Sequence, residues 1–300
     1  MENNLIGDHE ELNMENNLIA QEELNMENNL IARVGDHVSQ LARLKIFRLG
    51  YSKLTEVSHV VGGALTLGHN KLTEVSEVVG EALTALSDLS VNHNTIGKLP
   101  ANFSRAAESL TSLDLESNLF PELPPAILSL TVLKTLKLAG NPIAELPLAL
   151  GTLAFLTEIT VPSTDLGSVP RAPPQVGGAA VIRFLCGVAE CEGTGLLDLS
   201  AMNLHVIPAS VRSTATALTM LNLDNNPLQR LPNWLGELQR LPNWLGELQI
   251  LRRISLRGTP IMRLPATLGA IEALQEVALD EPGSGSSLVS PPAVVVQVSP

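Results

Sequence analysis

Two carboxylates at alternate positions of one expected strand are the first candidates for chemistry in this chain. Asp114 and Glu116 are two residues apart, so an extended strand places both side chains on one face. Such a pair can act as acid and base, or can bind a cation together with Asp88. No further ligand lies near them in the sequence, because the six histidines are scattered. We therefore expect solvated carboxylates here and no catalytic or metal site.

The remaining candidates for chemistry lie between residues 171 and 193. Cys186 and Cys191 are five residues apart and have no third or fourth ligand nearby in sequence, which argues against zinc. Gly177 and Gly178 lack the GxxxxGK[ST] context of a phosphate loop, so we interpret them as the entry to a helix. Since no nucleophile–base pair, metal cluster or phosphate loop is found, we expect neither enzyme activity nor a cofactor.

The remaining side chains are positioned by a repeated pattern, LxxLxLxxNxLxxLP. It reads TSLDLESNLFPELP at 111–124, LKTLKLAGNPIAELP at 133–147 and LTMLNLDNNPLQRLP at 218–232. Counting the first leucine as position 1, the repeats start at 21, 44, 62, 86, 110, 133, 156, 194, 218, 251 and 274. Apolar positions 4 and 6 alternate with polar residues, which predicts a strand with one buried face.

The segment after each strand predicts the return path of the chain. Proline follows position 14 and stops strand pairing, and apolar residues three apart then favour a helical or 3-10 turn. Such units bury their apolar side chains only by stacking. The predicted fold is an α/β leucine-rich repeat solenoid, a curved horseshoe with a parallel concave sheet and helical or 3-10 convex segments.

Position 9 is occupied by asparagine in most repeats. Its side chain can bond backbone groups that the turn would otherwise bury without partners, so we assign these asparagines a structural role. Met202 takes this position in one repeat and has no side chain suited to the task. The asparagines form a predicted ladder: Asn29, Asn70, Asn94, Asn118, Asn141 and Asn226.

The period also predicts the domain organisation. An irregular, duplicated segment at 1–20 precedes a first repeat block at 21–170. A helical interruption at 171–193 precedes a second repeat block at 194–280, and a disordered tail rich in Gly, Ser and Pro follows at 281–300. The copied segment 53–70 makes the step from 44 to 62 only 18 residues long, and we expect distorted packing there.

Composition limits the partners and the compartment. A formal net charge of −12 argues against nucleic acid and anionic membranes, which attract clustered Lys and Arg. Two cysteines and an acidic N-terminus without a long apolar run favour a reducing compartment, so we expect a cytoplasmic protein without a membrane span.

Positions 2, 3, 5, 7 and 8 form the open surface of the predicted strands. This surface is mostly acidic and hydroxylated and has two groups of basic residues. Because the concave face of a solenoid is its usual binding surface, we expect a protein partner of complementary charge to dock across 111–257. The candidate contact residues are Asp114, Glu116, Lys134, Lys137, Glu158, Asp198, Asp224, Arg252, Arg253 and Arg257.

The return motifs LPPAILSLTVL and LPNWLGELQIL, with the interruption GGAAVIRFL, carry a family resemblance. Over about 21–280 the chain resembles intracellular leucine-rich repeat proteins of the Ras-scaffold class, which includes the plant intracellular Ras-group-related proteins. The resemblance implies a non-catalytic scaffold whose partner is a small GTPase, a phosphatase or a kinase. Two alternatives remain: a recognition module of a defence receptor or pathogen effector, and the product of a decayed or misassembled repeat gene.

Overall fold

The structure, a computed structural model, divides into two compact units. Unit 1 comprises Met1–Ala144 and Leu153–Thr164, and unit 2 comprises Glu145–Thr152 and Asp165–Pro300. The predicted tail at 281–300 and most of the segment at 1–20 lie outside the described residues. The structure describes residues 11–12, 22–34, 44–57, 63–76, 84, 86–162, 177–214, 217–233, 235, 251–261, 264–265, 268, 271 and 273–279.

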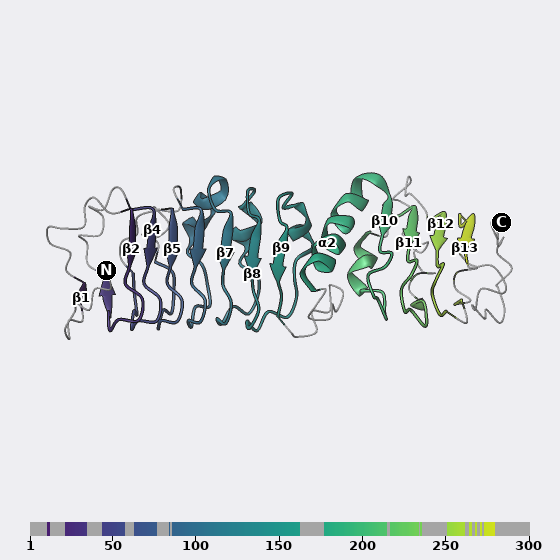
Figure 1. Ribbon diagram of the computed structural model, residues 1–300. Helices are drawn as coiled ribbons and strands as arrows, with labels where there is room; N and C mark the ends of the chain where they lie inside the picture. The colour runs from purple at the N-terminus through teal and green to yellow at the C-terminus, as the bar shows by residue number, and fades with distance from the viewer. Residues whose placement is uncertain are drawn as a thin grey trace. The chain divides into compact units, whose positions relative to one another are not determined.

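Seven short parallel strands form the main sheet of unit 1 (Figure 1). Each pairing joins equal repeat positions, so Leu113 lies opposite Leu89 on one side and Leu136 on the other. Each strand occupies positions 3 to 5 of its predicted repeat. In order across the sheet the strands are β2 (Glu23–Asn25), β4 (Ile46–Arg48), β5 (Ala64–Thr66), β6 (Asp88–Ser90), β7 (Ser112–Asp114), β8 (Thr135–Lys137) and β9 (Glu158–Thr160).

The middle residue of each of these strands enters the core. Phe47 and Leu113, for example, have no exposed surface, whereas the residues on either side of them are half-buried. Burying one such side chain contributes about 1.5–3 kcal/mol. A smaller pairing joins β1 (Glu11–Leu12) in parallel to β3 (Arg33–Val34), which lies in the return segment of the first repeat.

The 18-residue step between β4 and β5 does not distort the strands. Phe47 lies opposite Leu65 in the same register as elsewhere, and the N–H of Lys71 donates to the carbonyl of Leu54 at 2.8 Å. Leu54 and Leu65 are buried. The expectation of distorted packing is therefore wrong for 44–57 and 63–76, because the shortened coil still brings its leucines into the core. Residues 58–62 lie outside the described part.

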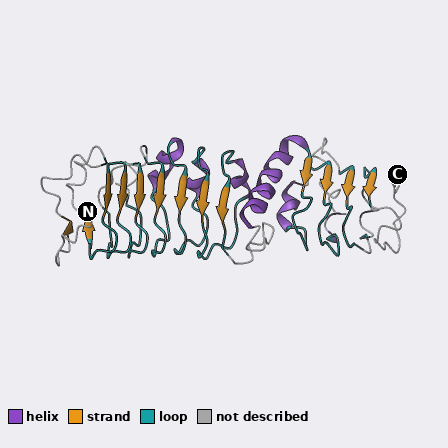
Figure 2. Cartoon of the chain, viewed as in Figure 1, coloured by secondary structure: helices purple, strands orange, loops and turns teal. Residues whose placement is uncertain are grey.

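The return segments contain 3-10 helices where the LP motif predicts them (Figure 2). In unit 1 these are η2 (Ala101–Glu108) and η3 (Pro125–Ser129). The N–H of Phe103 donates to the carbonyl of Pro100, and the ring of Phe103 is fully buried. Proline thus ends the extended segment and starts a turn whose apolar side chain faces the core.

Unit 2 contains a four-stranded parallel sheet and the long helix α2 (Gly177–Thr194). The strands again occupy positions 3 to 5 of their repeats. Among the described residues, no helix is long and apolar enough to cross a membrane. In sheet order the strands are β10 (Leu196–Asp198), β11 (Met220–Asn222), β12 (Arg253–Ser255) and β13 (Glu276–Ala278).

Helix α2 packs on β10 and on two 3-10 segments of unit 2, η4 (Leu148–Thr152) and η5 (Ala209–Thr214). Its buried side chains follow helical spacing and are Val181, Phe184, Leu185, Val188 and Cys191. Gly151 of η4 meets the helix so closely that a Cβ added there would lie 2.1 Å from the carbonyl oxygen of Leu185. A side chain at this position would therefore separate the two elements.

Candidate functional site

The position-9 asparagines connect successive coils below the strand ends. The amide nitrogen of Asn118 donates to the carbonyls of Val91 at 2.9 Å and Leu115 at 3.1 Å, and its oxygen accepts the N–H of Ile96 at 3.0 Å. Asn70, Asn94, Asn141 and Asn226 make corresponding bonds. Asn29 donates within its own repeat, to the carbonyls of Met26 and Glu27. These bonds hold the ends of adjacent strands together. The exposed residues at equal positions of successive repeats therefore stay side by side.

Position 8 adopts the left-handed conformation in every repeat in which the structure describes that position. Glycine takes this conformation readily, whereas for other residues it is energetically unfavourable. The N–H of each non-glycine residue here donates to the position-7 carbonyl of the next repeat, as from Tyr51 to Gly68 at 2.9 Å and from His69 to Asn92 at 2.9 Å. The position-8 residues with positive φ are Asn28, Tyr51, His69, His93, Ser117, Gly140, Ala201, Asn225 and Gly258.

Three consecutive position-8 residues of unit 1 carry stacked rings. The ring of His69 lies between those of Tyr51 and His93, with centroids 4.0 Å apart on each side and interplanar angles of 10° and 14°. Burial and the adjacent His93 lower the pKa of His69. The expectation that the histidines are scattered is thus wrong for His69 and His93, because their equal repeat positions bring them together. We call the three rings the ring ladder.

The predicted contact residues of unit 1 lie along the strands and are partly engaged with one another. Asp114 pairs with Lys137 at 3.8 Å and accepts from the amide of Asn92 at 3.2 Å. Glu116 accepts the hydroxyl of Thr160 at 2.6 Å. Glu158 accepts the hydroxyl of Thr135 at 3.4 Å, and Lys134 is exposed. These bonds join side chains at positions 3, 5 and 7 of four consecutive repeats, from the one that contains β6 to the one that contains β9.

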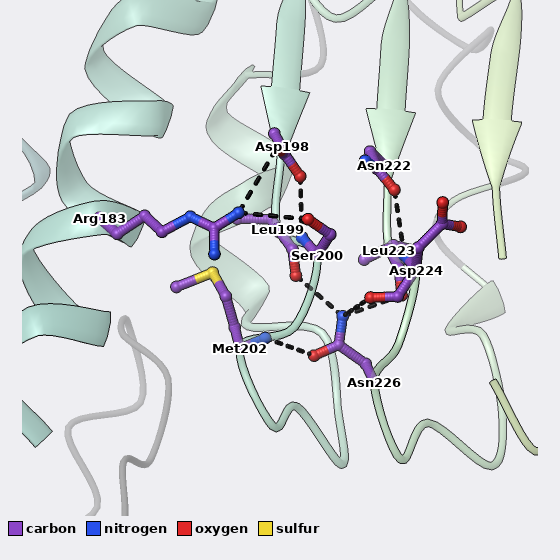
Figure 3. A network of polar contacts seen from close by, with 9 residues as sticks. All are labelled: Arg183, Asp198, Leu199, Ser200, Met202, Asn222, Leu223, Asp224 and Asn226. Carbon is purple, nitrogen blue, oxygen red and sulfur yellow. Dashed lines mark hydrogen bonds and ion pairs between the residues drawn. The ribbon is translucent and has the colours of Figure 1, made fainter. Parts of the chain in front are cut away.

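In unit 2, helix α2 places an arginine over the first strand of the sheet (Figure 3). Arg183 reaches the carboxylate of Asp198 at 3.4 Å and the hydroxyl of Ser200 at 3.2 Å. Partial burial alone would raise the pKa of Asp198, but hydrogen bonds from Ser200 and the guanidinium of Arg183 outweigh it and hold that pKa below its ordinary value. Asp198 is therefore an ionised end of a helix-to-strand link.

The next strands of unit 2 hold a second polar group. Asp224 accepts the hydroxyl of Ser255 at 2.6 Å and the backbone N–H of Arg257 at 2.7 Å. Arg253 forms an ion pair with Glu276 of the adjacent strand. Within the described part of the chain, the guanidinium groups of Arg252 and Arg257 contact no acid, and both residues are exposed. Two positive charges that flank β12 are consequently available to a partner.

The two cysteines lie on α2, away from the strand surfaces. Cys191 is fully buried and Cys186 is half-buried. Burial raises the pKa of both thiols; a hydrogen bond with Thr214 opposes this at Cys191, and nearby glutamates add to it. Among the described residues, no group of three His, Cys, Asp or Glu is arranged to hold a metal ion.

Sequence reasoning missed Arg183 and the ring ladder. The ladder had a signal in the sequence, because residues 51, 69 and 93 all fall at position 8 of their repeats. Arg183 had none, because its contact with Asp198 depends on how α2 packs. The structure gathers Asp114, Glu116, Lys137 and Glu158 in unit 1 and keeps the arginines of β12 in unit 2.

Comparisons with known proteins agree with this architecture. Residues 217–238 match the Leucine Rich Repeat family. With the strand register, this match supports a leucine-rich repeat protein. No curated protein matches the chain.

Three solved structures are similar to it. One is a leucine-rich repeat protein of Leptospira interrogans (21% identity, 87% of this chain, 71% of that chain, TM-score 0.34). Another is the leucine-rich repeat domain of the type III effector XopL, with 19% identity over 86% of this chain and 76% of that chain and a TM-score of 0.43. The third is YopM, a leucine-rich effector protein from Yersinia pestis, with 17% identity over 88% of this chain and 78% of that chain and a TM-score of 0.43. At such scores the likeness carries no functional argument.

Proposed function

We propose that this protein is a non-catalytic scaffold or adaptor that binds a signalling protein through the exposed side of its strands. Leucine-rich repeat domains bind protein partners, and a surface fixed by buried leucines and asparagines loses little freedom on binding. The partner classes are those implied by the family resemblance: a small GTPase, a phosphatase or a kinase. Two free thiols on α2 support a cytoplasmic location.

The observation that carries this proposal is the pair of exposed arginines at the two ends of β12. Arg252 and Arg257 flank an ion pair, and within the described residues their guanidinium groups contact no carboxylate, although Asp224 accepts the backbone N–H of Arg257. Arginine is enriched at the energetic centres of interfaces because it offers charge, five donors and a planar face. We infer that an acidic surface of the partner covers β12.

Affinity capture from a lysate of the source cells tests the proposal. The bait is the full chain, and the test variant is R252E/R257E. The matched control R105E/R212E makes the same charge change on the 3-10 segments η2 and η5 rather than on the strands. We expect recovery of the partner to fall about tenfold for R252E/R257E, as for the loss of two desolvated charges, and to stay unchanged for the control. Equal recovery by both variants would reject β12 as the binding surface.

A further inference from the structure

The ring ladder of unit 1 ends at two sites with similar local sequences. Residues 27–30 read ENNL before the first ring, and residues 116–119 read ESNL after the last one. Each quartet supplies a glutamate at position 7, a short residue at position 8, the ladder asparagine at position 9 and a leucine at position 10. Leu30 is 58% exposed and Leu119 is 56% exposed. A glutamate and an exposed leucine therefore occur in the repeat next to each end of the ladder.

The spacing of the repeats matches the thickness of a further flat group at each end. Position 8 recurs once per strand, and strands of a sheet are about 4.8 Å apart, close to the thickness of a stacked ring. Asn28 and Ser117 hold the next two rungs and carry short side chains without rings. Their N–H groups are bonded to Gly50 and Ala139, so both backbones are held in the same frame as the rings.

The charges at these ends fit a cation. In the described repeats of unit 1, positions 7 and 8 contain Glu27 and Glu116 and no lysine or arginine. The carboxylate of Glu27 reaches over Gly50, the residue before Tyr51, since its Oε1 lies 3.4 Å from where a Cβ of Gly50 would stand. The carbonyl of Glu116 accepts the N–H of His93, and the Oε1 of its carboxylate accepts the hydroxyl of Thr160 at 2.6 Å. Lys53, two residues after Tyr51, is the nearest lysine in sequence and is exposed.

Metal binding by the two imidazoles does not fit this geometry. A ring nitrogen binds a metal along a lone pair that lies in the ring plane. The planes of His69 and His93 differ by only 14° and are stacked, so their lone pairs do not converge on one ion. The faces at the two ends of the stack are better suited to another flat group.

We propose that each end of the ring ladder accepts an arginine side chain of a basic segment in a protein partner. The planar guanidinium stacks on Tyr51 or His93, its charge is met by Glu27 or Glu116, and its stem lies against Leu30 or Leu119. The inference rests on the proposed function, because it supplies one chemical feature of the partner. The two ends are four strand spacings apart, about 19 Å, which an extended peptide spans in about six residues.

The single tyrosine of the chain makes this testable without assignment. Tyr51 labelled with carbon-13 in its ring gives one set of NMR signals from the full chain. The probe is a blocked Gly/Ser peptide with two arginines six positions apart. One comparison peptide has lysines, which keep the charge without the plane, and another has citrullines, which keep the plane without the charge. We expect the arginine peptide to shift the Tyr51 signals and to bind at least about tenfold more tightly than either.

Variants separate the two ends. E27Q and E116Q should each weaken the arginine peptide about fivefold, whereas E122Q, an exposed glutamate at position 13 of the same repeat as Glu116, should not. Y51N and H93N remove a ring but keep a residue that occurs at position 8 in Asn28 and Asn225, and calorimetry should show weaker binding for both. If Y51N or H93N fails to fold, the affinities of E27Q and E116Q for the arginine peptide test the inference instead.

Unmoved Tyr51 signals, equal affinity for the three peptides, or no effect of both E27Q and E116Q would overturn the inference. If the peptide fails while R252E/R257E still loses its captured partner, the ladder inference falls and the proposed function stands. If capture is insensitive to the β12 arginines while the arginine peptide binds as expected, the proposed β12 surface falls and the ladder inference stands.

Discussion

The side-chain oxygen of Asn226 accepts the backbone N–H of Met202 at 3.1 Å. Met202 holds position 9 of the preceding repeat, where most repeats have an asparagine, and it is buried. The same oxygen accepts the N–H of Leu204 at 2.9 Å. The amide nitrogen donates to the carbonyls of Leu199 and Leu223 (Figure 3). One asparagine therefore bonds the backbone of the coil that lacks its own.

Replacing Asn226 with alanine should strongly destabilise unit 2. The substitution leaves several buried N–H and carbonyl groups without partners, and we expect a loss of about 3 kcal/mol in the free energy of unfolding. Asn222, half-buried on β11, gives the matched control, because its oxygen accepts only the nearby N–H of Asp224. N222A should cost less than about 1 kcal/mol. Urea unfolding followed by circular dichroism measures both, and equal losses would contradict the assignment.

The strand register was predictable because it depends on the position-4 leucines, which the repeat pattern itself marks as buried. Leu89, Leu113 and Leu136 lie opposite one another because each fills position 4. The ring ladder was harder to predict, since position 8 resembles a variable surface position until its positive φ and its bond to the next repeat are known. Contacts such as Arg183 with Asp198 depend on the packing of α2, which the repeat period does not encode.

Gly151 should tolerate no side chain. An alanine Cβ would lie 2.1 Å from the carbonyl oxygen of Leu185, so η4 and α2 must move apart, and we expect a cost of about 1–3 kcal/mol. Gly193, near the end of α2, has nothing within 4 Å of an added Cβ. G193A should be neutral or stabilising by up to about 1 kcal/mol, since alanine favours helix. Thermal melting compares the two; an unchanged Tm for G151A would show that this contact is looser than described.

His69 should make stability depend on pH. Burial and His93 lower its pKa from the ordinary 6.5, so below pH 6.5 the unfolded chain binds a proton that the folded chain resists. The stabilising contribution is complete above that pH and is lost as the pH falls through the folded-state pKa. Urea midpoints at pH 7.5 and 5.5 test this. H69N should reduce the difference between them, and the same difference in both proteins would exclude His69 as the cause.

The thiols of α2 should react slowly. Burial raises the pKa of Cys191 and Cys186, and alkylation requires the thiolate. We expect iodoacetamide at neutral pH to leave Cys191 unlabelled and to label Cys186 more slowly than a free thiol. Both should label fully in denaturant, and peptide mass spectrometry gives the extent at each site. Rapid native labelling of Cys191 would mean that α2 opens readily from the sheet.

Deleting residues 53–70 should lower the melting temperature. The segment completes one coil in register and buries Leu54, Leu65 and Leu67. In stacked repeats stability is close to a sum over units and their interfaces, so removing an integrated coil removes its share. The deletion restores a 24-residue step, as the copied sequence shows. A higher melting temperature would show that the short coil stores strain exceeding its burial.

The central claim is that the strand surface of unit 2 binds a protein. Its most direct test is the dissociation constant of the captured partner, measured by calorimetry for the unaltered chain, R252E/R257E and R105E/R212E. We predict about a tenfold increase for R252E/R257E, equal to about 1.4 kcal/mol, with the Tm and the control unchanged. The same dissociation constant for all three proteins would contradict the claim.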